Sequence, residues 1–81
     1  MKVRLLFFSI LRDYFHESEK EIEMDEPVQA RTLFLSLFKD SRLACQFLRS
    51  TRFALNNEYV APETVIRGGD ELAFIPPTSG G

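Results

Sequence analysis

Two apolar segments, one near each end of the chain, constrain its fold more than any other feature. Lys2–Phe8 and Glu71–Ile75 are both dominated by large hydrophobic side chains and both have the length of a β-strand. A chain of 81 residues builds one hydrophobic core and therefore one domain. Both segments must contribute to that core, so we expect them to pair in parallel at the centre of a mixed sheet.

The residues between these segments predict two further strands. Glu19–Met24 alternates apolar with acidic residues, which is typical of a strand at the edge of a sheet. Arg52–Asn56 is expected to place Phe53 and Leu55 inward. Tyr59–Ile66, which contains a proline, is expected to cross the domain as an irregular, partly extended segment.

Three helices are predicted in the same region. Ser9 is expected to cap a short helix that includes Phe15, a second helix runs through Leu33–Phe38, and Ser41 is expected to cap a third. Each repeats apolar residues at i, i+1, i+4 and i+5, which places one stripe against a core. The order β-α-β-α-α-β-β predicts an α+β fold of the ubiquitin-like β-grasp type, with the helices packed on one face of the mixed sheet.

Turn residues mark the ends of the later strands. Asn56-Asn57-Glu58 is expected to form a turn because Asn tolerates positive φ. Gly68-Gly69-Asp70 is expected to be a tight structural turn, since a strand follows it and a phosphate-binding loop would need a helix there. Pro76-Pro77 ends the last strand because proline donates no backbone hydrogen bond. Residues 76–81 are then expected to project as an extended tail.

Composition and charge exclude several classes of function. A net charge of −2 without a basic stripe argues against nucleic acid. No apolar run is long enough for a membrane span, and the first residues do not resemble a signal peptide. A single cysteine forms neither an internal disulfide nor a metal cluster. We expect a cytoplasmic protein that itself binds no metal and no cofactor.

The outward face of the sheet is predicted to bind a partner. If Val3, Leu5 and Phe7 face the core, then Leu6 and Phe8 face away from it. By the same alternation in the last strand, Ile75 points outward beside them. An exposed apolar cluster of this kind marks a contact surface. In the alternative interpretation, the segment Tyr59–Ile66 of the chain itself covers this face.

The diglycine at the end of the sequence points to chemistry at its carboxylate. Gly80 and Gly81 have no Cβ, so they can pass through a narrow slot and approach a phosphate closely. A carboxylate must be activated before it reacts as an electrophile, which implies a partner that uses ATP. The alternative is a frayed terminus without function.

Three other features are interpreted as structural. His16, the only histidine, is expected at the surface or at a helix end. Cys45 is expected in the apolar stripe of the third helix, as a buried and unreactive thiol. The acidic residues of 17–26 do not have the spacing of a metal-binding loop and are expected to form a solvated sheet edge.

The segment from Asp70 to Gly81, DELAFIPPTSGG, resembles the C-terminal signature of the small subunit of molybdopterin synthase, the MoaD family. The opening VRLLFFSILRD, from Val3 to Asp13, is similar to that family's first strand and helix. The resemblance spans essentially the whole chain, although residues 28–50 match only in pattern.

This resemblance implies a sulfur carrier that has no turnover alone. An E1-like enzyme would adenylate the Gly81 carboxylate with ATP, and a sulfur donor protein would convert the adenylate to a thiocarboxylate. The tail would enter the large synthase subunit, in a heterotetramer, and give its sulfur to cyclic pyranopterin monophosphate. The resemblance implies partner contacts by Phe8 and Ile75, and the alternation described above adds Leu6. The tail residues Pro76, Pro77, Thr78 and Ser79 are also candidate contacts. Arg12 is a candidate for an ion pair with the large subunit, the alternative being a solvated charge on an exposed helix face. Gly80 would be needed for passage into the active-site channel.

Two other classes of function stay open at this point. The same activated diglycine would serve a ubiquitin-like protein modifier, joined through Gly81 to lysines of other proteins, or a carrier for thiazole synthesis. A plain interaction module with an inert tail is the third possibility. Replacing Gly81 separates the chemical interpretations from the inert module.

Overall fold

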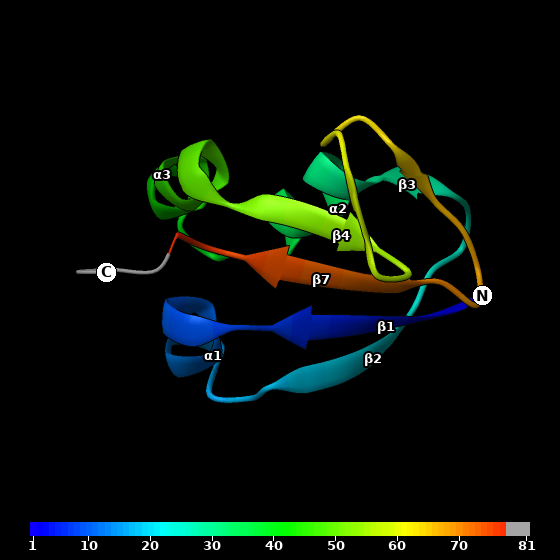
Figure 1. Ribbon diagram of the computed structural model, residues 1–81, viewed down its shortest axis with the longest axis horizontal. Coiled ribbons are helices and arrows are strands. Elements are labelled where there is room, and N and C mark those ends of the chain that lie inside the picture. Colours follow the sequence, from blue (N-terminus) through cyan, green and yellow to red (C-terminus); the bar gives the residue numbers. More distant parts are fainter. Residues whose placement is uncertain (78–81) are drawn as a thin grey trace.

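The computed structural model describes residues 1–77, so the predictions for Thr78, Ser79, Gly80 and Gly81 lie outside the described residues. Five strands form one mixed sheet in the order β2-β1-β7-β4-β5 (Figure 1). Their bounds are β1 Lys2–Phe7, β2 Glu19–Glu23, β4 Arg52–Leu55, β5 Glu58–Val60 and β7 Glu71–Ile75. The helices are α1 Ser9–Phe15, α2 Ala30–Ser36 and α3 Ser41–Ser50. A second, two-stranded sheet pairs β3 Val28–Gln29 with β6 Val65–Ile66.

The first and last apolar segments lie side by side at the centre of the sheet, as predicted. β1 and β7 run parallel, with Leu5 opposite Leu72 and Phe7 opposite Phe74. These four side chains are buried, because alternate residues of both strands face the same side. β2 pairs only with β1 and is an edge strand, which confirms the prediction from its acidic alternation.

The three helices cover one face of the five-stranded sheet (Figure 1). Phe34 of α2 is fully buried at the centre of this layer. Its ring lies 5.0 Å from that of Phe74 and 5.6 Å from that of Phe53, measured between centroids. Burying an aromatic side chain of this size is among the largest single contributions a small core receives. Within residues 1–77, no helix lies on the other face of the sheet.

Two helix starts differ from the predictions. Ser9 does not cap α1; Phe8 is the N-cap residue and Ser9 is the first helical residue, with a φ of 53°. The chain makes this abrupt turn because α1 begins directly after β1 ends. α3 is capped by Asp40 instead of Ser41: the Asp40 carboxylate accepts hydrogen bonds from the amides of Arg42, at 2.9 Å, and Leu43, at 3.3 Å. An acceptor in the N-cap position satisfies amides that have no partner within the helix.

The segment Tyr59–Ile66 is more ordered than predicted, because it contains β6 and part of β5. The loop in the middle of this segment also caps the start of α2, whose N-cap residue makes no capping hydrogen bond with its side chain. The amide of Ala30 donates to the carbonyl oxygen of Thr64, and the amide of Arg31 donates to that of Pro62, both at 2.8 Å. This loop therefore fixes the start of α2.

The tight turn before β7 depends on Gly69, whose φ is +89°. Replacing Gly69 with Ala is expected to lower the free energy of unfolding by about 1–2 kcal/mol, because a Cβ disfavours a left-handed backbone. Urea denaturation of the wild type, Gly69→Ala and Gly69→Asn measures this. Asn tolerates positive φ, so Gly69→Asn should lose less. Equal losses in the two variants would show that the φ of this turn is not the cause.

Candidate partner-binding face

The predicted outward residues lie together in one hollow on the open face of the sheet. Leu6, Phe8 and Ile75 all line it, and its volume is about 220 Å³. The remaining lining residues are Ala54, Asn57, Tyr59, Glu71 and Ala73. The strand register brings these residues side by side, since Leu6 of β1 lies opposite Ala73 of β7, and Ala73 lies opposite Ala54 of β4. Small Ala side chains in the middle and large ones around them make the face concave.

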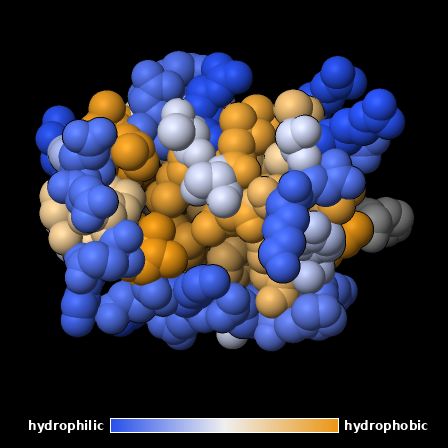
Figure 2. Space-filling view, turned by 180° about the vertical axis from the view of Figure 1, so that it is seen from behind, coloured by the Kyte–Doolittle hydropathy of each residue, from blue (hydrophilic) through white to orange (hydrophobic). Residues whose placement is uncertain are grey.

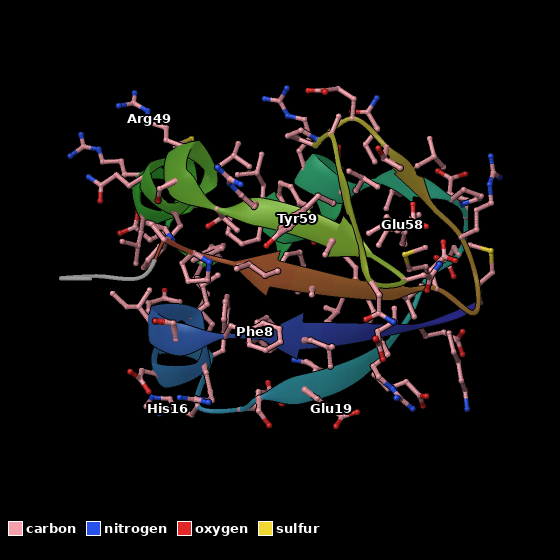
Figure 3. The ribbon with its side chains drawn as sticks, viewed as in Figure 1. Phe8, His16, Glu19, Arg49, Glu58 and Tyr59 are labelled. Carbon is pink, nitrogen blue, oxygen red and sulfur yellow. The ribbon has the colours of Figure 1, made fainter. Side chains whose placement is uncertain are left out.

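Phe8 and Tyr59 are the most prominent apolar groups of this face. Their residues are 45% and 66% exposed, and both project from the open side of the sheet in Figure 3. Large apolar side chains exposed together in this way are typical of a contact surface. The segment Tyr59–Ile66 therefore adds an aromatic residue to the face and does not cover it.

Tyr59 is a member of this face that the sequence pattern did not predict. The two-residue turn Asn56-Asn57, with φ values of 50° and 73°, joins β4 to β5 and places Tyr59 directly opposite Ala54. Two consecutive residues with positive φ are typical of a type I′ hairpin. Phe53 and Leu55 face inward, so Ala54 between them faces outward. Tyr59 pairs with Ala54 in this hairpin and therefore faces outward as well.

Charge divides the open face into two halves. Arg4 bridges two carboxylates, with Nε 3.3 Å from Glu19 and Nη1 3.4 Å from Glu71, and Lys2 lies 3.8 Å from Glu21. This ion-paired half lies toward the start of β1, whereas the apolar hollow lies toward its end. On the apolar half, the Arg52 guanidinium carbon lies 5.9 Å from the centre of the Tyr59 ring, a distance at which a cation attracts the ring face.

The tail leaves the domain next to the apolar half. Ile75 is the last residue of β7 and lies opposite Arg52. Pro76 is buried and Pro77 is exposed, so Pro76 packs against the domain and fixes where the tail begins. α1 and α3 flank this end of β7 (Figure 1). Arg12 is exposed on α1 but does not line the hollow.

Cys45 is exposed, which contradicts the prediction that it lies in the core. A helix advances by about 100° per residue. The inward stripe of α3 is formed by Leu43, Ala44, Phe47 and Leu48, and Cys45 lies beyond its margin. In α3 the apolar pairs were assigned correctly, whereas the residue directly after such a pair was not. In α1 the first member of each apolar pair is exposed, Ile10 by 52% and Tyr14 by 38%, which contradicts the prediction that the whole stripe faces the core.

His16 agrees with its prediction, because it is exposed and ends α1 with a left-handed φ of 61°.

Within residues 1–77, no group of three or more His, Cys, Asp or Glu side chains is arranged to hold a metal ion. The helices of this described part are all too short or too polar to cross a membrane.

Residues 5–81 match the ThiS family. A molybdopterin synthase sulfur carrier subunit of Chlamydomonas reinhardtii is 30% identical over 83 residues, and the alignment covers 100% of both chains. These matches confirm the resemblance identified from the terminal motif.

Solved structures show the same fold. SAMP1 of Haloferax volcanii has a TM-score of 0.78 at 20% identity, covering 100% of both chains. The subunit 1 and 2 complex of the molybdopterin-converting factor of Helicobacter pylori contains a chain with a TM-score of 0.65 at 24% identity, again with 100% of both chains covered. The ubiquitin-like β-grasp fold is thereby confirmed.

Proposed function

The chain belongs to the ThiS family, and on this premise we propose that it is the sulfur-carrier subunit of molybdopterin synthase. One observation carries the proposal. Phe8, Tyr59 and Ile75 form an exposed apolar hollow at the end of β7 from which the tail leaves. A partner that docks on this face meets the root of the tail, the buried Pro76, beside the hollow. The full-length similarity to a sulfur carrier subunit supports the same function.

The carrier chemistry takes place at the Gly81 carboxylate. In an E1-like enzyme, a carboxylate oxygen attacks the α-phosphorus of ATP, and pyrophosphate leaves. The acyl-adenylate is an electrophile, so sulfide sulfur from a donor protein adds to the Gly81 carbonyl carbon and AMP departs. The product is a thiocarboxylate, which is a stronger nucleophile than the original carboxylate. ATP belongs to the activating enzyme, and this chain supplies the acyl group.

Docking on the large synthase subunit brings the sulfur to its substrate. The apolar hollow binds the large subunit, and the buried Pro76 holds the root of the tail against the domain. Gly80 and Gly81 are small enough to pass through a narrow channel. The thiocarboxylate sulfur then attacks a carbon of cyclic pyranopterin monophosphate and displaces an oxygen from it. Water hydrolyses the resulting thioester, which returns the Gly81 carboxylate and leaves the sulfur on the pterin, and two such deliveries build the dithiolene. Helicobacter pylori supplies a relevant precedent, because its converting-factor subunits 1 and 2 were solved as a complex.

The mass of the intact protein tests this function. We expect protein purified from its own host, without thiols or acid, to contain a fraction heavier by the mass difference between sulfur and oxygen. Fragmentation should map the change to Gly81, and hydrolysis should remove it. Incubation of the unmodified protein with the activating enzyme, ATP and sulfide should restore it.

Other masses would favour the other candidates. Gly81 joined by isopeptide bonds to lysines of other proteins, with no thiocarboxylate, would identify a protein modifier. A thiocarboxylate that is transferred only to a thiazole precursor would keep the carrier chemistry and change the pathway. An unmodified mass under every condition would contradict any chemistry at Gly81.

A further inference from the structure

A second apolar groove lies on the opposite side of the molecule, between β2 and α2. Its volume is about 680 Å³, larger than that of the hollow on the open face. Ile22, Met24, Val28, Leu33 and Leu37 supply its apolar lining, and Thr32 and Ser36 line it from α2. Figure 2 shows apolar side chains gathered in the middle of this side of the molecule, with hydrophilic ones around them. The function proposed above does not use this groove.

The groove borders the outer edge of β2, which pairs with no strand of the described residues 1–77. β2 is the last strand on its side. The amide of Met24, directly after β2, donates to the carbonyl oxygen of Met1, and Ile22 of β2 lies opposite Val3. Peptide groups alternate in direction along a strand, so the N–H and C=O groups of Glu19, Glu21 and Glu23 point away from β1. These groups could pair with an added strand.

Among residues 1–77, the ionisable residues that line the groove are all acidic: Glu23, Asp25 and Glu26. Glu23 accepts a hydrogen bond of 2.7 Å from the Met1 ammonium, which lowers the pKa of its carboxyl. Asp25 and Glu26 have no salt-bridge partner among residues 1–77. The one basic residue of β2, Lys20, lies 3.8 Å from Glu17. The rim of the groove therefore carries uncompensated negative charge.

We propose that this groove binds an extended segment of a partner protein in which apolar residues alternate with Lys or Arg. The segment pairs with the free edge of β2, which is a known mode of peptide recognition. Its apolar side chains enter the groove beside Ile22. The basic side chains that alternate with them leave the strand on the other face, and near the end of β2 they are long enough to reach Asp25 and Glu26 at the rim, where the chain turns. A second copy of this chain fits less well, because two β2 edges would place glutamates against glutamates.

The groove and the tail can be occupied at the same time. The groove lies on the helix side of the sheet, near the end of β2 at Glu23 and the start of the chain. The hollow and the tail root lie on the open side, near the end of β7. A protein held at β2 would leave Phe8, Tyr59 and Ile75 accessible. The proposed site would therefore recruit a partner to the carrier and would not compete with sulfur transfer.

The test uses the full chain, labelled with nitrogen-15, and a capped synthetic peptide of alternating lysine and valine. We expect the peptide to shift the amide signals of β2 and α2 and to leave those of β5 unchanged. The double variant Asp25→Asn/Glu26→Gln should raise the Kd about three- to tenfold, because two exposed charge pairs are lost. Thr32→Arg, on the exposed wall of α2, should also weaken binding, by bulk and by charge.

Matched controls distinguish the groove from simple charge attraction. Glu58→Gln removes an exposed carboxylate on β5, outside the groove, and should leave the Kd unchanged. A peptide of alternating lysine and glycine has the same charge without the apolar side chains and should bind much more weakly. Equal binding of both peptides, equal effects of the Glu58 and Asp25/Glu26 changes, or shifts confined to the open face would each overturn the proposal. If the shifts of the β2 signals depended on the concentration of the protein and not on that of the peptide, the groove would be a self-association surface and the proposal would be wrong.

Discussion

Adding one alanine after Gly81 is expected to abolish thiocarboxylate formation and, with it, synthesis of molybdopterin. The change converts the Gly81 carboxylate into an amide, whose carbonyl oxygen no longer attacks ATP as a carboxylate does. It also places a Cβ at the residue that must pass through the partner's channel. The measurement is the intact mass after incubation with the activating enzyme, ATP and sulfide, followed by product formation with the large subunit.

A removable extension provides the control for this prediction. The same chain can be made with a longer segment after Gly81 that a site-specific protease removes exactly behind that residue. Before cleavage, the protein should keep its thermal stability and gain no sulfur; after cleavage, it should gain sulfur like the wild type. Sulfur transfer by the uncleaved form would place the reactive group elsewhere and reject the proposed chemistry.

The centre of the fold was predictable because the apolar character of its two strands and the alternation of side chains along them indicate the same arrangement. Lys2–Phe8 and Glu71–Ile75 are apolar enough to require burial, and a chain of 81 residues has only one core to bury them in. Alternation along each strand then assigned Leu6, Phe8 and Ile75 to the outward face, and the structure places all three in one hollow. Prediction succeeded here because burial and strand period act on every residue of the segment.

Features that depend on one bond or one angle were not predictable in the same way. Asp40 and Ser41 are both good capping residues, and the sequence does not show which of them precedes the first helical turn. Cys45 follows the inward Ala44 directly, so its exposure depends on the rotation of α3 about its axis. Tyr59 joined the open face through a hairpin whose turn type fixes the register.

The groove beside β2 illustrates a further limit. Its wall residues come from β2, β3 and α2, and no periodic pattern connects these segments. The acidic residues of 17–26 were interpreted as a solvated edge, which is correct for the side chains of Glu19 and Glu21. The same run also supplies Asp25 and Glu26 to the groove, since the chain turns after Glu23 toward β3. A sequence shows the charges, whereas only the path of the chain shows what they surround.

Replacing Phe8 with Ala is expected to weaken binding to the large synthase subunit without unfolding the domain. Phe8 is 45% exposed and follows the end of β1, so its removal leaves the core intact. At an interface, truncating a large anchor of this kind costs about 1–4 kcal/mol, which corresponds to about a fivefold to several-hundredfold higher Kd. Ile75→Ala and Tyr59→Ala should act in the same direction, because both residues line the same hollow.

Val65→Ala is the matched control for these three variants. Val65 is 40% exposed, close to the value for Phe8, but it lies on β6 in the second sheet and does not line the hollow. Calorimetric titration with the large subunit should give the Val65 variant the affinity of the wild type, with thermal denaturation confirming that each variant is folded. If Phe8→Ala and Val65→Ala bound equally tightly, the open face would not be the docking surface. The partner would then hold this chain by its tail alone, and the hollow would need a different explanation.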